Sequence, residues 1–196
     1  MSSYVALRGM VFATAVTVVA FALPAAAQTQ AGAAAPTAPV TPAAGEVAPD
    51  FTASVTDSTG KVWPVSLSSL RGNVVVLAFY PLDRSSGCTA ELNKFRDEYA
   101  TLFGPGVVVL PVSIDSLGSH ASWAKEAHFP FAMIADTKSE LATKFGSQGG
   151  ARPYFKRTVF VIGKDGKIVY AEPKFNALAQ DGYDKLAAAI KQAKTS

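Results

Sequence analysis

The segment NVVVLAFY, residues 73–80, is a continuous apolar run rich in valine, and PLDRSSGC, residues 81–88, follows it directly. Such a run is typical of a strand buried on both faces of a sheet. Residues 106–115 form a second run of the same kind. Between the two runs, apolar side chains recur at helical spacing, at Leu92, Phe95, Tyr99 and Leu102. We therefore expect two parallel central strands joined by a helix, in a connection that is right-handed in nearly all known proteins.

The only cysteine of the chain, Cys88, falls where the first of these strands gives way to the helix. Open α/β sheets place their functional sites at the carboxyl ends of their strands. The free N–H groups and the positive dipole end of a helix favour a thiolate over a thiol, so this position predicts a reactive sulfur. The alternative is that Cys88 is a small buried hydrophobic residue, as lone cysteines often are.

The N-terminal segment has the pattern of a secretory signal peptide over residues 1–27. Arg8 precedes an apolar stretch at residues 10–23, and small residues at 25–27 come before Gln28. The apolar stretch is shorter than the roughly 20 residues of a membrane-spanning helix. We therefore expect an exported protein, periplasmic if the source is Gram-negative, with no membrane attachment after cleavage. A retained N-terminal anchor is the alternative.

Residues 28–45 carry no charge and consist largely of alanine with repeated proline. A segment of this composition cannot bury a core, so we expect a disordered or extended tether. Glu46 is the first acidic residue, and we place the domain boundary there, which leaves residues 46–196 for one folded domain. The formal net charge of +3 is too small to indicate nucleic acid or anionic lipid as a partner.

The other patterns predict a hairpin before the central strands and a series of strands and helices after them. In the helix expected at 117–128, Trp123 and Ala127 face inward. The full set is a hairpin at 51–55 and 61–65, a helical turn at 66–70, a helix at 117–128, a strand at 131–135, a helix at 139–145, a hairpin at 158–163 and 167–171, and a helix at 184–194. This order is that of a thioredoxin-like α/β fold, with a central mixed sheet flanked by helices and an N-terminal β-hairpin extension.

The spacing Pro81-x-x-x-Ser85-x-x-Cys88 resembles the peroxidatic loop of peroxiredoxins, the alkyl hydroperoxide reductase and thiol-specific antioxidant family. The run at residues 87–91, Gly-Cys-Thr-x-x-Glu, is most similar to the bacterioferritin-comigratory, or Q-type, branch of that family. The resemblance extends over nearly all of residues 46–196.

The resemblance implies roles for the residues around the sulfur. Cys88 would attack the peroxide, and Ser85 would offer its hydroxyl to the thiolate or to the bound peroxide; helix capping is the alternative role of Ser85. Peroxide chemistry needs a fixed cation, because charge develops on the departing oxygen. Arg157 matches the arginine that opens a strand and reaches the peroxidatic cysteine, whereas a surface salt bridge is its alternative. The rival cations are Arg84, within the loop, and Arg152.

Two further residues match the family pattern. Glu91 matches a carboxylate that helps to hold the arginine, although its charge opposes thiolate formation; a favourable acid in the first turn of a helix is the alternative. Pro81 would shape the loop and shield the sulfur, and its alternative is a plain strand terminator. Gly163 stands where family members commonly have aspartate, at a turn away from the site.

Because this chain has a single cysteine, the oxidised Cys88 must be reduced by a thiol from another molecule. Asn93 stands five residues after Cys88, where the Q-type branch often has a resolving cysteine. We expect a sulfenic acid on Cys88 to be reduced by a thioredoxin-like protein or a low-molecular-weight thiol, or to pair with a second copy, in a monomeric or homodimeric protein. Because no C-x-x-C motif is present, dithiol exchange of the thioredoxin type is excluded.

No cluster of His, Cys, Asp or Glu has metal-ligand spacing, so we expect no metal or cofactor, and we expect His120 and His128 to be ordinary residues. The sequence thus predicts a one-cysteine thiol peroxidase that reduces hydrogen peroxide and organic hydroperoxides through a sulfenic acid on Cys88. The alternative is a non-catalytic, thioredoxin-like redox-sensing or binding module, which is favoured by Asn93 and by Ser86, where the branch usually has proline.

Overall fold

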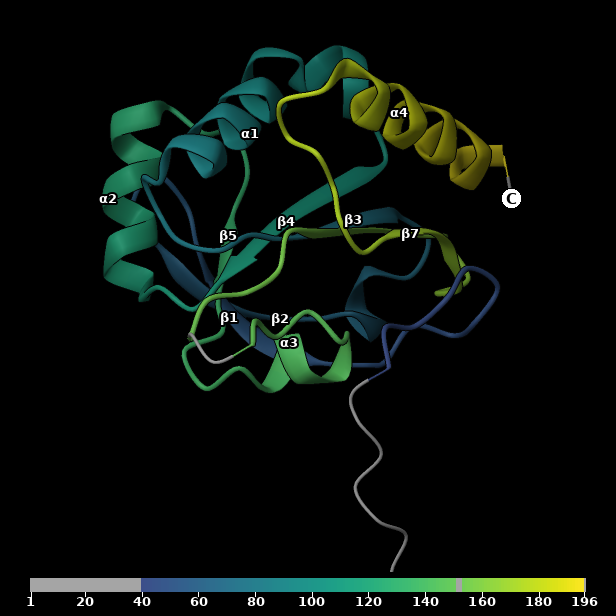
Figure 1. The fold of residues 1–196 in the computed structure, drawn as a ribbon, viewed down its shortest axis with the longest axis horizontal. Helices are drawn as coiled ribbons and strands as arrows, with labels where there is room; N and C mark the ends of the chain where they lie inside the picture. The colour runs from purple at the N-terminus through teal and green to yellow at the C-terminus, as the bar shows by residue number, and fades with distance from the viewer. Residues whose placement is uncertain (1–39, 151–152, 196) are drawn as a thin grey trace, which may run out of the picture. The chain divides into compact units, whose positions relative to one another are not determined.

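The computed structural model describes residues 40–150 and 153–195. The predicted signal peptide, most of the tether and Arg152 lie outside the described residues. The strands form one seven-stranded sheet in the order β2-β1-β5-β4-β3-β6-β7 (Figure 1). They are β1 (Thr52–Thr56), β2 (Val62–Ser66), β3 (Val74–Phe79), β4 (Val107–Ser113), β5 (Met133–Ala135), β6 (Thr158–Ile162) and β7 (Ile168–Glu172). The helical elements are η1 (Ser68–Leu70), α1 (Ser86–Asp97), the π-helical turn η2 (Tyr99–Phe103), α2 (Leu117–Ala127), α3 (Glu140–Lys144) and α4 (Gln180–Thr195).

Strand β3 occupies the middle of the sheet, and every one of its residues is buried. It pairs in parallel with β4 and antiparallel with β6, which makes the sheet mixed. Helices α1, α2 and α4 lie on one side of the sheet and α3 on the other (Figure 1). Alternate β3 side chains enter two separate cores, so that Val76 and Leu77, for example, belong to different clusters. This two-sided burial explains the continuous apolar run at residues 73–80, and it confirms the predicted strand–helix–strand unit.

The N-terminal hairpin belongs to the same sheet. Strand β1 pairs antiparallel with β2 on one side and antiparallel with β5 on the other, where Val55 lies opposite Ile134. At the opposite edge, β6 and β7 form the predicted hairpin, whose turn contains Gly166 with a φ of +80°. Glycine adopts this conformation without the steric cost that a side chain would bring. The thioredoxin-like architecture is therefore confirmed, and the hairpin extension lengthens one edge of the central sheet.

Two helices differ in detail from the predictions. Helix α4 begins at Gln180, four residues earlier than expected. Its first three residues, Gln180 to Gly182, carry no apolar side chain, and this hid the true start from the pattern, although Tyr183 is buried with the rest of the helix face. In α2 the buried side chains are Trp123, Ala124 and His120, whereas Ala127 is only half-buried. Within the described part of the chain, no helix combines the length and the apolar character needed to cross a membrane.

The last residues of the predicted tether contact the folded domain. The N–H of Gly45 donates to the carbonyl oxygen of Ile168, and the N–H of Ile168 donates to that of Glu46, each at 2.8 Å. Pro42 is buried as well. Strand β7 is an edge strand, and its free backbone groups are partly satisfied by this segment. Ordered chain therefore begins before Glu46, a feature that composition could not show because it depends on backbone pairing.

Candidate active site

Cys88 lies in the first turn of α1, just beyond the carboxyl end of the central strand β3. Helix α1 begins at Ser86, and its first intrahelical bond runs from the N–H of Thr89 to the carbonyl oxygen of Ser85 at 2.8 Å. The cysteine side chain is fully buried. The structure thus places the sulfur at a helix start on the functional edge of the sheet, where the sequence predicted it.

Arg157 is the residue immediately before β6, and the sheet register delivers it to the sulfur. Because β6 runs antiparallel to β3, with Thr158 opposite Phe79, Arg157 stands at the same edge as the chain that leaves β3. Its Nη2 donates to Cys88 Sγ at 3.3 Å. A permanent cation therefore contacts the only sulfur that could act as a nucleophile.

Glu91 lies three residues after Cys88 on α1, so both side chains project from one face of the helix. Its Oε2 accepts a hydrogen bond from Arg157 Nη1 in an ion pair, and the carboxylate is fully buried. Its other oxygen, Oε1, is buried without a hydrogen-bond partner among the described residues. One guanidinium thus bridges a carboxylate and a sulfur, which is the arrangement that the resemblance implied for these three residues.

Burial raises the pKa of Glu91 to about 7, although the charge and the hydrogen bonds of Arg157 oppose the shift. Burial acts to lower the pKa of Arg157, but Glu91 and the nearby Cys88 outweigh it and leave the pKa of the guanidinium raised. Near neutral pH, Glu91 is therefore protonated in part of the molecules. In those molecules the positive charge of Arg157 faces the sulfur without compensation.

Ser85 and Pro81, both half-buried, lie in the segment between β3 and α1. Ser85 is the N-cap residue of α1, in an extended conformation, but its side chain makes no capping hydrogen bond. The capping alternative is therefore not how its hydroxyl is used in this structure. Pro81 is half-buried directly after β3, where the N–H of Tyr80 donates the last bond, to Val112 O at 3.0 Å. Their predicted roles in holding the peroxide and shielding the sulfur stay predictions.

Gly87 is a site residue that sequence reasoning missed. A Cβ atom added at this position would lie 3.1 Å from Arg157 Nη2, tighter than ordinary van der Waals contact. The absence of a side chain therefore makes room for the guanidinium beside Cys88. The signal was a glycine directly before the cysteine at a helix start, but its purpose depends on a residue 70 positions away.

The rival cation Arg84 makes no hydrogen bond with the sulfur. Arg84 points to α2, where its Nη2 lies 3.0 Å from Glu126 and also donates to Ser122 Oγ at 3.0 Å. Arg152 lies outside the described residues. Among the described residues, Arg157 is the cation in contact with Cys88.

A second feature that sequence reasoning missed is a buried polar network under the loop. The Asp83 carboxylate accepts from Tyr80 Oη at 2.7 Å and from Ser119 Oγ at 2.6 Å, and it lies 3.0 Å from His120 Nδ1. His120, expected to be ordinary, is fully buried in this network. No three His, Cys, Asp or Glu side chains converge as a metal site would require within residues 40–150 and 153–195.

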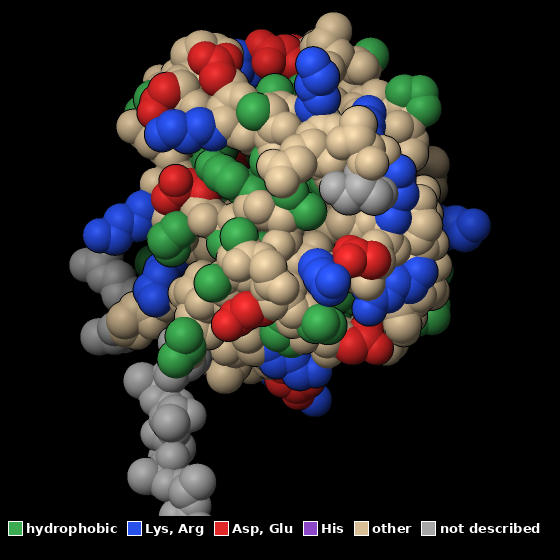
Figure 2. Space-filling view, turned by 90° about the vertical axis from the view of Figure 1, so that its right-hand side faces the viewer, with side chains coloured by type: hydrophobic (Ala, Val, Ile, Leu, Met, Phe, Trp, Pro, Cys, Tyr) green, Lys and Arg blue, Asp and Glu red, His purple; other side chains and the backbone are tan. Residues whose placement is uncertain are grey.

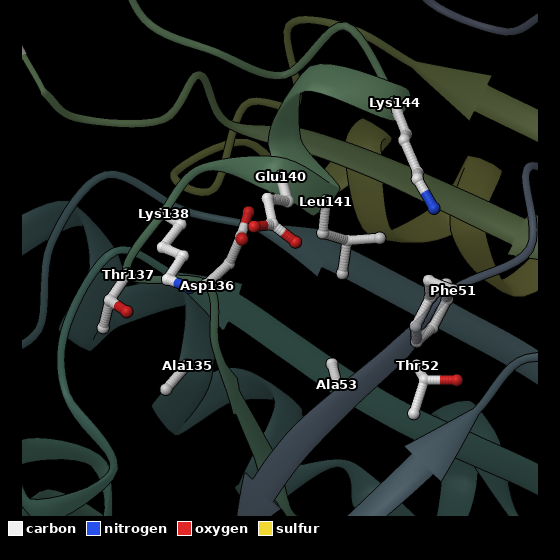
Figure 3. A pocket seen from close by; sticks show the side chains of 10 residues that line it. All are labelled: Phe51, Thr52, Ala53, Ala135, Asp136, Thr137, Lys138, Glu140, Leu141 and Lys144. Carbon is white, nitrogen blue, oxygen red and sulfur yellow. The ribbon is translucent and has the colours of Figure 1, made fainter.

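A separate cavity of about 170 Å³ lies between β1, β5 and α3, and no candidate site residue lines it (Figure 3). The carboxylates of Asp136 and Glu140 lie close together at its α3 end. Asp136 accepts from the N–H of Ala142 at 2.8 Å, and Lys144 donates to the carbonyl oxygen of Asp50 at 2.9 Å. These polar groups hold α3 in place and leave no converging set for chemistry.

An open groove of about 730 Å³ has Arg157 in its lining. Its surface is built by the segment after β7 together with the residues that lead into β6. The lining residues are Lys156, Arg157, Pro173, Lys174, Phe175 and Asn176. Arg157, whose side chain is 17% exposed, thus borders a partly apolar groove with a basic rim.

The chain is similar in sequence to known proteins. The model of the AhpC/TSA family matches residues 44–171. The peroxiredoxin bcp of Coxiella burnetii is 35% identical over 136 residues, which cover 66% of this chain and 87% of that protein. The chloroplastic peroxiredoxin Q of Triticum aestivum is 36% identical over 129 residues, which cover 64% of this chain and 57% of that protein.

Solved structures of related proteins have a similar fold. Peroxidoxin BcpB of Mycobacterium tuberculosis has a TM-score of 0.65 at 29% identity, covering 76% of this chain and 97% of that one. The bacterioferritin comigratory protein of Xanthomonas campestris has a TM-score of 0.64 at 25% identity, covering 72% of this chain and 90% of that one.

The fold and the site define a thioredoxin-like protein with one cysteine at a helix start, held by an arginine. The chain belongs to the AhpC/TSA family, and the predicted similarity to the bacterioferritin-comigratory, Q-type peroxiredoxins is confirmed. Its enzyme class is thiol-dependent peroxidase.

Proposed function

We propose that Cys88 is the attacking residue of this peroxidase and that Arg157 is its principal catalytic cation. The observation that carries the proposal is the 3.3 Å contact between Arg157 Nη2 and Cys88 Sγ in the first turn of α1. A surface salt bridge, the alternative role for Arg157, does not explain why the guanidinium turns inward to a sulfur.

The reaction is a displacement on the O–O bond of the peroxide. The Cys88 thiolate attacks one oxygen of ROOH, an S–O bond forms and the O–O bond breaks. With the uptake of one proton, the products are a sulfenic acid on Cys88 and ROH, which is water when the substrate is hydrogen peroxide. The sulfur is oxidised by two electrons and the peroxide is reduced by two.

Arg157 acts on both partners of this step. Its positive charge stabilises the thiolate before attack, and a fixed N–H donor stabilises the charge that develops on the departing oxygen. Glu91 orients the guanidinium through Nη1 and leaves Nη2 directed at the sulfur. We propose that Ser85, whose hydroxyl makes no capping bond, donates to the bound peroxide, and that Pro81 limits access of water to the sulfur.

The burial of Cys88 bears on the choice of substrate. A sulfur that is closed to solvent in the resting conformation is reached more easily by hydrogen peroxide than by a bulky hydroperoxide. The Xanthomonas campestris relative has an alkyl peroxide reduction activity. We propose that this protein also reduces organic hydroperoxides, but more slowly than hydrogen peroxide. Stopped-flow rates with hydrogen peroxide and with cumene hydroperoxide measure this order directly.

The reductant is a thiol from another molecule, because Cys88 is the only cysteine. We propose a thioredoxin-like protein or a low-molecular-weight thiol, acting on a monomer or a homodimer. On the face that Figure 2 shows, Lys and Arg are interspersed with Asp and Glu, which argues against a polyanionic partner for that face. We also propose export through residues 1–27, to the periplasm of a Gram-negative source; N-terminal sequencing of the secreted protein tests the cleavage.

The function is tested by comparing the protein with its Cys88→Ser variant. With a thiol reductant present, the protein should consume hydrogen peroxide, and the variant should not exceed the uncatalysed rate. A dimedone trap followed by mass spectrometry should label Cys88 after one equivalent of peroxide. Equal rates for the two proteins, with an unmodified thiol, would instead identify the non-catalytic binding or redox-sensing module.

A further inference from the structure

The loop that leads into α1, the helix that carries the sulfur, is attached to α2 at two neighbouring residues. Asp83 reaches Ser119 and His120 on α2, and Arg84 reaches Ser122 and Glu126 on the same helix. We call residues 81–85, between β3 and α1, the active loop. The two attachments differ in burial: Asp83 is buried, whereas the Arg84–Glu126 pair is exposed.

Asp83 is held through both its side chain and its backbone. Oδ1 accepts from Tyr80 Oη, and Oδ2 accepts from Ser119 Oγ and lies 3.0 Å from His120 Nδ1. The N–H of Asp83 donates to Asp115 Oδ2 at 2.9 Å. Because both oxygens and the N–H are satisfied, the middle of the active loop has little freedom to move.

His120 connects this attachment to the sheet. Its Nε2 lies 3.1 Å from the carbonyl oxygen of Ile134 in β5. A backbone carbonyl can only accept, so Nε2 carries the hydrogen and donates it. The active loop is thereby tied through α2 to a buried strand, and not only to a surface helix.

The backbone next to Asp83 is strained. Arg84 has a φ of +60°, in the left-handed region that residues other than glycine rarely adopt. Such a conformation persists only where the surrounding contacts over-determine it. Two residues later α1 begins, so the bend at Arg84 sets the direction from which the chain enters the helix that carries Cys88.

We propose that Asp83, with Tyr80, Ser119 and His120, forms a positioning network that fixes the active loop and so holds Cys88 Sγ against Arg157. This inference rests on the proposed function of Cys88. None of the four residues makes a hydrogen bond with the sulfur; they act through the loop. The exposed Arg84–Glu126 pair lies on the same loop and the same helix, and it contributes little to this positioning because solvent screens it.

The test compares Asp83→Ala with Asp83→Asn and with Glu126→Ala. Asp83→Ala should lower the rate constant for hydrogen peroxide by about 10- to 100-fold, the size expected when a reacting group is displaced by about 1 Å. Asp83→Asn should recover most of the rate, because its Oδ1 still accepts from Tyr80 Oη, and its Nδ2, in the place of Oδ2, can donate to His120 Nδ1 and to Ser119 Oγ. Glu126→Ala should match the unmodified protein.

Hydrogen exchange separates positioning from general destabilisation. In Asp83→Ala, faster exchange should be confined to residues 81–90, while β3 and β4 keep their protection. If Asp83→Ala does not fold, Tyr80→Phe and Ser119→Ala each remove one hydrogen bond from the network, and each should lower the rate by about 2- to 10-fold with local loss of protection.

The outcomes are distinct. If the unmodified protein exceeds Cys88→Ser but these network variants retain its rate, the positioning role is overturned and the peroxidase stands. If loss of rate is matched by loss of protection throughout the sheet, the network is merely structural. If the unmodified protein does not exceed Cys88→Ser, the proposed function itself fails and this inference fails with it.

Discussion

Two arginine–glutamate pairs lie close to the active loop, and their surroundings make them different in kind. In the Arg157–Glu91 pair, the side chains are 17% and 0% exposed; in the Arg84–Glu126 pair, they are 40% and 60% exposed. The chemical groups are identical. Because their exposure differs, water is excluded from the Arg157–Glu91 pair and screens the Arg84–Glu126 pair. Only the buried pair contacts the sulfur, through Arg157.

The two glutamates show the difference directly. Burial raises the pKa of Glu91 to about 7 despite its arginine partner. The hydrogen bond from Ser122 and the neighbouring Arg84 lower the pKa of the exposed Glu126. An arginine partner thus fails to compensate the lost hydration of the buried Glu91, whereas an arginine beside the exposed Glu126 helps to stabilise its charge. Under the proposed mechanism, Arg157 acts on the sulfur because its ion pair is buried beside Cys88, and not because it has a partner.

The largest expected effect is that of removing the buried cation. Arg157→Gln should lower kcat/KM for hydrogen peroxide by about 10²–10³-fold, since a fixed donor to the developing charge is lost. Arg157→Lys keeps the charge but cannot bridge Glu91 and the sulfur, so it should recover only part of the rate. Steady-state kinetics at saturating reductant measure both. If Arg84→Gln lowered the rate as much as Arg157→Gln, the contrast between the pairs would be wrong.

The next effect is the contribution of Glu91 to the pH dependence of the free energy of unfolding. The folded protein holds the Glu91 proton up to about pH 7, whereas the ordinary pKa of a glutamate in an unfolded chain is 4.5. Between these values the unfolded state binds fewer protons, so the free energy of unfolding falls as pH rises, by up to about 3 kcal/mol. Glu91→Gln removes this contribution.

Urea unfolding of the unmodified protein and of Glu91→Gln at pH 5, 6, 7 and 8 measures this contribution of Glu91. Relative to the unmodified protein, Glu91→Gln should become more stable as pH rises from 5 to 7, with no further change above pH 8. A difference that stays constant over this range would show that Glu91 is ionised in the fold throughout. Glu126→Gln, measured in parallel, should show no rise of this kind.

A smaller effect is expected from filling the space that Gly87 leaves. In Gly87→Ala, the new Cβ meets Arg157 Nη2 at 3.1 Å, so the guanidinium must shift by a few tenths of an ångström. The peroxidase rate should fall by about 3- to 10-fold, while the melting temperature should hold or rise, since alanine favours a helix over glycine.

Gly118→Ala is the matched control, because Gly118 is also near a helix start and its Cβ would meet nothing closer than Ser116 Oγ at 3.9 Å. It should gain similar thermal stability and keep the full rate. Equal rates for the two variants would show that the guanidinium has more room than the structure indicates.

The smallest effect belongs to the exposed pair. Glu126→Gln should leave the free energy of unfolding nearly unchanged, because solvent screens the pair, and should change the peroxidase rate by less than about twofold. Thermal unfolding and initial rates at low and high salt check this. A large, salt-dependent loss of rate would place the exposed pair in the machinery that positions the loop.

Most of the fold was accessible from local pattern. The valine-rich runs, the helical spacing after Cys88 and the turn at residues 165–166 each report on their own neighbours, and they predicted the sheet and its hairpins. The early start of α4 and the pairing of Gly45 with β7 were missed, because a polar first turn and a backbone edge leave no apolar signature. Family resemblance supplied Arg157 and Glu91, which the structure brings together with Cys88.

By itself, the sequence determined that a lone cysteine would stand at a helix start after a central strand, since strand and helix periodicities are local. Only the tertiary structure decided that Glu91 is cut off from water, that Gly87 makes room for a guanidinium, and that Asp83 meets His120. Desolvation and close approach depend on atoms that lie dozens of residues apart along the chain. The identity of a residue states which charge or donor it carries, but the packing around it decides how strongly that group acts.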